Sequence, residues 1–418
     1  MLRKLCRALG AALLTVLVAA GSAGASTERP RFLGVVASTE LGEPEFAVMR
    51  EGGVRTYRLA ISWPSVQRSR GAPLDWTASD RLVRGLVENE IEPLPVVYGT
   101  PCFVVPCDAG DRGQPSPRPP LGSGPAKLAW AAFLNEIVGR YGPGGSFWRD
   151  NPSVPRRPLR VWEIWNEPNV PQFYAPEPSV DGYAELLQIS ARAITMADPG
   201  ATILVGGLAG DPDKPRATPG PRFLDGLYRT GARPHFDAIA VHPYAPHLAG
   251  VRSQLDAFRE VLASHHDRET PIWVTELGWG ATPSGEGRLV ETIVGQAQML
   301  RTALGLLSAK REEWNIARAL WYSWRDPPPG QPACSWCRSA GLFDVAGDPR
   351  PSWHAFTALS TTGDRPLGPE VELPDAPEVD DGGNDTPPRW VVVVAALALC
   401  LVAGALLLLR RSRARRPR

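Results

Sequence analysis

The chain has 418 residues, of which 43% are hydrophobic, with 45 lysines and arginines against 44 aspartates and glutamates, as in a globular protein of one large or two ordinary domains. The charge is unevenly placed, because residues 1–25 and 390–418 hold nine of the basic residues and no acid, so the stretch between them is acidic. That stretch lacks the basic surplus that nucleic-acid binding favours, which argues against DNA or RNA as a partner.

Residues 1–25 are predicted to be a signal peptide. Basic residues at positions 3, 4 and 7 precede an apolar run from Ala8 to Ala20, and Ala23-Gly24-Ala25 resembles a cleavage site. A first transmembrane helix is the alternative, but the apolar run is short for one. We therefore expect an exported protein.

Residues 26–361 are predicted to form one (β/α)8 TIM-barrel domain. Short apolar strands alternate with stretches of helical periodicity, which implies a parallel sheet. The predicted strands are residues 32–37, 56–61, 92–98, 159–165, 202–207, 238–242, 272–276 and 319–323. The predicted helices include residues 126–141, 183–197, 251–264 and 289–309. Eight strands fit a closed barrel better than the alternative, an open doubly wound sheet, and no Gly-rich phosphate turn supports the open sheet.

Four cysteines lie within this domain as two local pairs, Cys102 with Cys107 and Cys334 with Cys337. A C-x-x-C pair can bind zinc or carry out redox chemistry, but only one is present and no histidine pair accompanies it. In an exported protein, disulfides that close small loops are favoured for both pairs. Whether Cys334 and Cys337 pair with each other stays open.

The C-terminal residues are predicted to form a membrane anchor. Residues 362–389 are rich in Pro, Asp, Glu and Gly and are expected to be a disordered acidic linker. Residues 390–409 form an uncharged apolar stretch of about the 20 residues that a transmembrane helix needs, and residues 410–418 form a basic tail on the cytoplasmic side. A buried core helix is the alternative, but the stretch has no amphipathic pattern. We expect a single-pass membrane protein whose domain lies outside the cytoplasm.

The segment VWEIWNEPN, residues 161–169, places two glutamates in a tryptophan-rich strand. A buried carboxylate is costly unless it is paired or used. Strand alternation puts Glu163 on the same face as Trp165, where we expect a structural acid paired with an arginine. Pro168 cannot continue the ladder, so the strand ends before it and Glu167 is expected to stand in the site.

Polar and aromatic residues follow the ends of the predicted strands, where barrels of this type build their active sites. They are Arg58, Tyr98, Asn166, Glu167, His242, Tyr244, Glu276, Trp279 and Trp324. Carboxylates can transfer a proton or attack as nucleophiles, and aromatic rings can stack on sugar rings. The histidines are isolated and no acid cluster accompanies them, so we expect no metal and no cofactor.

These motifs in this order resemble the clan A glycoside hydrolases, TIM-barrel retaining glycosidases that include families 39 and 5. The matching motifs are Arg58-Leu59 through Trp63 with Gln67, Gly71, Trp76 and Asp80; Glu163 through Asn169; Tyr183 with Ala197-Asp198-Pro199-Gly200; His242-Pro243-Tyr244; Trp273 through Gly278; and Gly341-Leu342-Phe343 with Pro351. The resemblance spans about residues 55–355, nearly the whole predicted domain.

The resemblance implies a role for each motif residue. Glu167 would be the general acid/base, Glu276 the nucleophile, and Asn166 the ligand of the sugar 2-hydroxyl. Arg58 and Tyr244 would keep the nucleophile ionised, while Glu167, partly desolvated near a second carboxylate, would be protonated near neutral pH. The acids end strands four and seven, so we expect carboxyl groups about 5–5.5 Å apart, the spacing of a retaining enzyme.

Two functions from different classes follow. The first is a membrane-anchored extracytoplasmic glycosidase that hydrolyses O-glycosyl bonds of a β-linked polysaccharide or oligosaccharide with retention, as a monomer. The alternative is a catalytically inactive glycan-binding or scaffolding protein on a hydrolase-like barrel. Both carboxylates and their partners are present in the sequence, which favours the enzyme.

Overall fold

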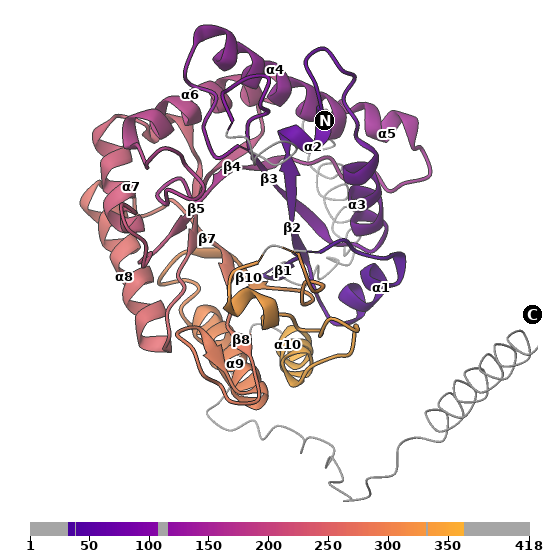
Figure 1. The fold of residues 1–418 in the computed structure, drawn as a ribbon, viewed down its shortest axis with the longest axis vertical. Helices are drawn as coiled ribbons and strands as arrows, with labels where there is room; N and C mark the ends of the chain where they lie inside the picture. The colour runs from indigo at the N-terminus through magenta and orange to yellow at the C-terminus, as the bar shows by residue number, and fades with distance from the viewer. Residues whose placement is uncertain (1–31, 38, 108–115, 332, 363–418) are drawn as a thin grey trace, which may run out of the picture. The chain divides into compact units, whose positions relative to one another are not determined.

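The computed structural model describes residues 32–37, 39–107, 116–331 and 333–362, which form a closed barrel of parallel strands (Figure 1). Neighbouring strands pair in the order β1-β10-β7-β6-β5-β4-β3-β2. The barrel strands are β1 (Leu33–Val36), β2 (Thr56–Ser62), β3 (Glu92–Tyr98), β4 (Val161–Asn166), β5 (Thr202–Ala209), β6 (Ala238–His242), β7 (Ile272–Leu277) and β10 (Ile316–Tyr322). The eight strands agree with the eight predicted ones, and the closed ring rules out the open sheet.

Helices surround the ring of strands, as the view down the barrel shows (Figure 1). They are α1 (Glu43–Glu51), α2 (Trp63–Val66), α3 (Thr77–Glu88), α4 (Gly124–Tyr141), α5 (Ser146–Asp150), α6 (Val180–Ala197), α7 (Gly220–Arg229), α8 (Leu248–Ser264), α9 (Ile293–Ala309) and α10 (Pro351–Thr362). Short elements complete the set: the 3-10 helices η1 (Arg233–His235) and η2 (Trp336–Ser339), and a small sheet of β8 (Gly280–Ala281) and β9 (Val290–Glu291).

Side-chain caps decide where several helices begin. The Ser179 hydroxyl accepts a hydrogen bond from the Gly182 amide, and the Thr292 hydroxyl accepts one from the Gly295 amide. Such caps satisfy amides that the first helical turn leaves without partners. Helix α6 therefore starts three residues before the predicted 183, and α9 starts after the predicted 289, because β9 occupies the residues before Thr292.

The core has two layers. A small cluster inside the barrel comprises Val36, Leu94, Leu204, Ala238, Ala240, Trp273 and Leu320. The larger cluster packs the outward-facing side chains of the strands against the helices. At the N-terminal ends of the strands, Arg318 pairs with Glu92 at 3.0 Å and its guanidinium lies 5.0 Å from the ring centre of Trp273. This packing fills the lower barrel and leaves the upper rim for a site.

The predicted signal peptide, the linker from residue 363 onward, the transmembrane segment and the basic tail lie outside the described residues. Helix α10 reaches Thr362, one residue beyond the predicted domain end. Among the helices within the described ranges, none combines the length and the hydrophobicity that crossing a membrane requires.

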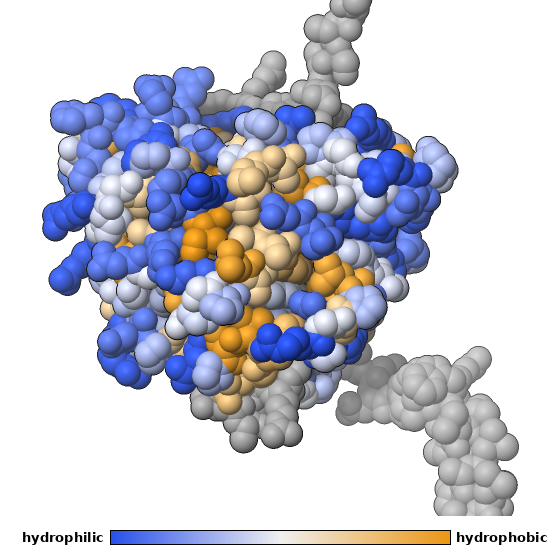
Figure 2. Space-filling view, turned by 90° about the horizontal axis from the view of Figure 1, so that it is seen from above, coloured by the Kyte–Doolittle hydropathy of each residue, from blue (hydrophilic) through white to orange (hydrophobic). Residues whose placement is uncertain are grey.

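The surface in Figure 2 is largely hydrophilic, with hydrophobic residues gathered near the middle of the face shown. The large hydrophobic side chains most exposed among the described residues are Leu128, Met196, Ile293, Val294 and Val345. They come from α4, α6, α9 and the segment before α10, and scattered apolar residues of this kind are normal on soluble domains.

Candidate active site

A cavity of about 750 Å³ opens at the C-terminal ends of the strands. Asn166 and Glu167 from the end of β4, His242 and Tyr244 from β6 and the residues after it, and Glu276 from β7 line one side of it. Five of the nine predicted site residues therefore surround one cavity. The side chains of Glu167 and Glu276 are 13% and 14% exposed, which fits acids that face a cavity rather than the core.

The backbone turns sharply at the end of β4. Trp165 has φ 71° and Glu167 has φ 41°, left-handed values that are uncommon for residues other than glycine and that cluster at functional sites. The turn sends the Trp165 ring outward, 6.1 Å from the ring of Trp130 in α4. The expectation that Glu163 and Trp165 share a face is therefore wrong, because the positive φ interrupts the alternation of the strand.

Glu163 is buried inside the barrel, where it holds Arg58. Its carboxylate accepts hydrogen bonds of 2.8 and 2.7 Å from the Arg58 guanidinium and one of 2.8 Å from the Gly207 amide. The predicted pairing of this acid with an arginine is confirmed. Arg58 also donates to Asn166 Oδ1 at 2.8 Å and to the Glu276 carboxylate. Arg58 is the third residue of β2 and not its end, and its guanidinium joins this strand to the ends of β4 and β7.

Glu276 is held as a charged carboxylate. Burial alone would raise the pKa of Glu276, but the charges of His242 and Arg58, together with hydrogen bonds from Tyr244 and Arg58, lower it below its ordinary value. The Tyr244 hydroxyl donates to Glu276 at 2.8 Å, as expected from the sequence. Burial and the Glu276 charge raise the pKa of Tyr244 well above its ordinary value, so the phenol keeps its proton and remains a donor.

His242 connects the two acids. Its Nδ1 lies 2.8 Å from Glu167 Oε1 and 3.7 Å from Glu276 Oε2, while Nε2 lies 3.1 Å from the Thr275 hydroxyl. One ligand atom from each of Glu167, His242 and Glu276 lies within 4.8 Å of the others. The two carboxylates are therefore close enough for one small bound group to contact both.

The same three side chains form the one group that could together bind a metal ion among the residues that the structure describes. Glu276 is already bound by Arg58 and Tyr244, so its oxygens have partners without an ion. The expectation of a site without metal stays a prediction.

The family described as the glycosyl hydrolase catalytic core matches residues 162–352, from the second residue of β4 to the start of α10. This region is therefore similar to a glycosyl hydrolase catalytic core. Both predicted catalytic acids lie inside the match, whereas Arg58 and Tyr98 precede it. No curated protein matches the chain.

Solved structures share the fold of the core at low sequence identity. A family 39 glycoside hydrolase from the gut symbiont Bacteroides cellulosilyticus WH2 is 20% identical, with a TM-score of 0.58 over 79% of this chain and 63% of that one. A monomeric beta-xylosidase from Caulobacter crescentus CB15 is 20% identical, with a TM-score of 0.58 over 78% and 68%. A GH5_18 protein from Bifidobacterium longum subsp. longum, in complex with Manb1-4GlcNAc, is 16% identical, with a TM-score of 0.58 over 79% and 78%.

The chain spans less than two thirds of the first of these proteins, and at such identities the likeness concerns the fold. Together with the family match, it supports a glycosidase of the clan A type, as the sequence motifs predicted.

Two of the predicted site residues lie away from the cavity. Trp279 is fully buried, packs against Trp321 and donates from its indole nitrogen to the Ala245 carbonyl at 2.9 Å. Trp324 is also buried, and its indole nitrogen donates to Glu45 Oε1 at 2.7 Å. Both residues follow a strand end, but their rings fill spaces between the barrel and its helices, so they are core residues.

Tyr98 does not line the cavity but lies near Arg58 and Glu276. The pKa of Tyr98 is raised above its ordinary value, mainly by burial. The charge of Glu276 also raises this pKa, whereas the charge of Arg58 lowers it. It ends β3, next to Ser62 of β2.

Sequence reasoning missed the residues that complete the cavity. They include Tyr322 at the end of β10, residues 334–337 and Ser339 after it, residues 211–214 after β5 and residues 286–290, the last of which begins β9. Trp336, which follows β10 in this set, has ring contacts with both Tyr244 and Tyr322. The signal that could have located Trp336 is its place between two cysteines, because a disulfide fixes the tryptophan that it brackets.

Proposed function

We propose that the chain is a membrane-anchored extracytoplasmic glycoside hydrolase that cleaves a β-linked glycan with retention of configuration. The observation that carries the proposal is that two acids face one cavity with different hydrogen-bond partners. Glu276 is kept ionised by Arg58 and Tyr244, and Glu167 faces it across the cavity beside His242. Acids in contrasting environments take different roles in acid-base chemistry.

In the first step, the Glu276 carboxylate attacks the anomeric carbon of the substrate. The bond to the leaving oxygen breaks as Glu167 transfers its proton to that oxygen, so the leaving sugar departs as a neutral alcohol. A covalent glycosyl ester then joins the sugar to Glu276. Arg58 and Tyr244 stabilise the carboxylate before it attacks, and they have less charge to bind once the ester has formed.

In the second step, a water molecule gives a proton to the Glu167 carboxylate and attacks the same anomeric carbon. The ester bond to Glu276 breaks, the carboxylate is regenerated, and both acids return to their starting states. Asn166 directly precedes Glu167 in the chain, and its Oδ1 accepts a hydrogen bond of 2.8 Å from Arg58. Its amide nitrogen is then oriented to donate to the sugar 2-hydroxyl.

The distance between the acids supports retention over inversion. Retaining glycosidases hold the two carboxyl groups about 5–5.5 Å apart, whereas inverting ones leave about 6.5–9.5 Å for a water molecule. One carboxylate oxygen of Glu167 and one of Glu276 lie within 4.8 Å of each other. The β linkage is supported by the solved structures, which include a beta-xylosidase and a complex with Manb1-4GlcNAc. The presence of both acids and their partners favours the enzyme over an inactive glycan-binding barrel.

Retention predicts which anomer appears first. We expect proton NMR of a 4-nitrophenyl β-glycoside hydrolysed by the full-length chain to show the β-anomer of the free sugar first, followed by slow mutarotation. A panel of 4-nitrophenyl β-D-xyloside, β-D-glucoside and β-D-mannoside includes the xylose and mannose named for the solved structures. The α-anomer as the first product would contradict the double displacement, and no hydrolysis of any glycoside would favour the inactive glycan-binding alternative.

The location outside the cytoplasm rests on the two ends of the sequence. The signal-like residues 1–25 and the apolar residues 390–409, followed by six arginines and no acid, favour one C-terminal membrane anchor with the domain outside. An anchored enzyme meets a polysaccharide of the cell envelope or surface more readily than a diffusing oligosaccharide.

This topology predicts the result of proteolysis on intact cells. Protease added outside should cut within residues 362–389 and release a fragment that contains nearly the whole catalytic domain, detectable by an antibody raised against it. Permeabilised cells are the control, in which the tail at residues 410–418 is digested as well. A chain that external protease leaves intact, while permeabilisation makes it sensitive, would place the domain inside.

A further inference from the structure

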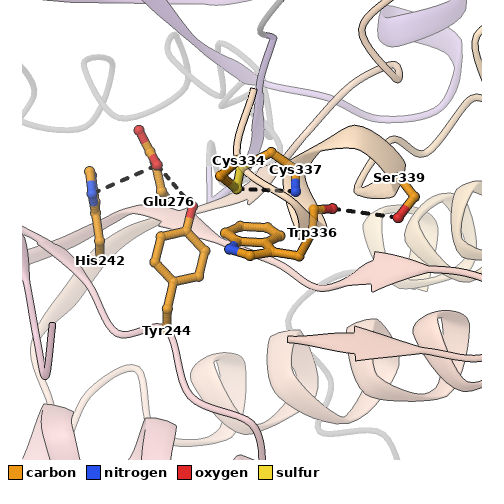
Figure 3. Close-up of a disulfide and its surroundings, with 7 residues drawn as sticks. All are labelled: His242, Tyr244, Glu276, Cys334, Trp336, Cys337 and Ser339. Atoms are coloured by element: carbon orange, nitrogen blue, oxygen red, sulfur yellow. Dashed lines mark hydrogen bonds and ion pairs between the residues drawn. A yellow bond between two sulfur atoms is a disulfide. The ribbon is translucent and has the colours of Figure 1, made fainter. Parts of the chain in front are cut away.

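The segment between β10 and α10 brings the sequence Cys334-Ser335-Trp336-Cys337 to the wall of the cavity. Cys334 and Cys337 form a disulfide, and Trp336 begins the short helix η2. All four residues line the cavity together with Glu276. Figure 3 shows the Trp336 indole between the disulfide and the Tyr244 ring, on the side of Tyr244 away from His242.

Trp336 packs against two tyrosines of the site. Its ring centre lies 4.9 Å from that of Tyr244 and 5.6 Å from that of Tyr322, with the planes inclined by 60° and 64°. The Tyr244 hydroxyl in turn donates to Glu276. The three rings thus make a continuous aromatic surface that begins beside the nucleophile and continues along the cavity wall.

The indole of Trp336 is only partly buried, unlike those of Trp279 and Trp324. Among the described residues, no group accepts a hydrogen bond from its Nε1, although the indole nitrogens of Trp279 and Trp324 both have acceptors. Tryptophan combines a large apolar ring with one donor, and this combination suits a ligand that has both C–H faces and hydroxyl groups. A sugar ring is such a ligand.

Different contacts hold the two ends of the segment formed by residues 334–339. On the C-terminal side, the Ser339 carbonyl accepts hydrogen bonds from Arg350 at 2.8 Å and from Gln296 at 3.4 Å. On the N-terminal side, the exposed Cys334 is joined to η2 by the disulfide and by a hydrogen bond of 3.1 Å from the Cys337 amide to its sulfur. The disulfide therefore restricts the residues immediately before the indole.

We propose that Trp336, positioned by the Cys334–Cys337 disulfide, is a substrate-contacting residue that forms the aromatic wall of the sugar subsite next to Glu276. The inference rests on the proposed glycosidase function. The disulfide acts through the indole, because it limits the positions that the ring can take and so reduces the entropy lost when a sugar binds. Disulfides that close short loops contribute least to global stability, so its loss should affect binding more than folding.

The first test compares the full-length chain with Trp336→Ala and Trp336→Phe on the 4-nitrophenyl β-glycosides named above. We expect Trp336→Ala to raise KM about tenfold, the equivalent of losing one aromatic stacking contact, while kcat stays within about threefold. Trp336→Phe keeps an aromatic face and should recover most of the loss. Trp336→Leu, an apolar side chain without a ring, serves if the alanine variant does not fold, and it should resemble Ala rather than Phe.

The second test removes the disulfide. The variant with Cys334→Ser and Cys337→Ser should raise KM in the same direction as Trp336→Ala but by less, because the ring is still present. A reductant should raise the KM of the parent protein and leave that of this variant unchanged. The matched control is the variant with Cys102→Ser and Cys107→Ser, since that disulfide closes a loop after β3 that does not line the described cavity.

The outcomes separate this inference from the proposed function. If the parent protein hydrolyses none of the glycosides, the proposed function fails and the inference fails with it. If the parent is active and Trp336→Ala has an unchanged KM, only the inference fails. A Trp336 variant that lowers kcat and moves the acid limb of the kcat/KM profile to higher pH would show that the indole acts on Tyr244 and Glu276 instead of on the sugar, which would also overturn it.

Discussion

Replacement of Glu276 by alanine should abolish hydrolysis of both natural and activated glycosides. In the proposed mechanism this carboxylate forms the bond to the anomeric carbon. No other acid among the described residues is positioned to form that bond instead. We expect kcat to fall by about 10⁴-fold or more, as for other enzymes that lose their nucleophile. The fold should survive, because Glu163 still holds Arg58 through two hydrogen bonds and the guanidinium does not become an unpaired buried charge.

Azide gives this variant a distinctive readout. A small anion can enter the space that the carboxylate vacates and attack the sugar from the same side in a single displacement, so Glu276→Ala should form an α-glycosyl azide from a β-glycoside. Glu260→Ala, which removes an exposed carboxylate on α8, is the control and should leave activity unchanged. Substantial activity of Glu276→Ala without azide would rule out its assignment as the nucleophile.

Replacement of Glu167 by alanine should separate substrates by their leaving groups. A 2,4-dinitrophenyl glycoside needs no proton in the first step, so its glycosyl-enzyme should form at close to the normal rate. A 4-methylphenyl glycoside needs that proton and should lose about 10²–10⁴-fold, the usual contribution of general acid catalysis. The second step lacks its general base in either case, so the dinitrophenyl substrate should show a burst followed by a slow steady state.

Azide again tests the role, with the opposite stereochemical result. It can replace water in the second step without a general base, so Glu167→Ala should recover turnover and form a β-glycosyl azide. Stopped-flow absorbance gives the burst, and NMR identifies the azide. Equal losses for the two aryl glycosides, without a burst, would show that Glu167 is not the acid/base.

The outcome also bears on His242. Its Nδ1 lies 2.8 Å from Glu167, and its Nε2 lies 3.1 Å from the Thr275 hydroxyl, so the imidazole is held in place beside the acid. In the Glu167→Ala variant the imidazole loses this partner and keeps the weaker 3.7 Å approach to Glu276. His242 is among the groups that lower the pKa of Glu276, so a shift in the acid limb of the kcat/KM profile of this variant would show that their contact has changed.

The sequence by itself determined the barrel and its two acids. Strand patterns recur with helical periodicity between them, and this local signal does not depend on which residues finally touch. The ends of parallel barrel strands must meet at one rim, so the topology alone brought Glu167 and Glu276 together although 108 residues lie between them in the chain. The motif resemblance then supplied their roles, and the pairing of Glu163 with an arginine followed from the cost of burying an unpaired acid.

Only the tertiary structure decided which side of the chain each large ring faces. Trp165 points outward because a positive φ interrupts the strand, and alternation could not foresee it. Because Trp279 and Trp324 follow strand ends, the sequence predicted that both would lie at the rim. Packing against the helices buries them instead. Trp336 lines the cavity although it is distant in the sequence from both acids. A disulfide and the contacts of Ser339 fix its position. Sequence patterns report the period of a regular element, whereas the direction of a side chain in an irregular segment depends on contacts that exist only after folding.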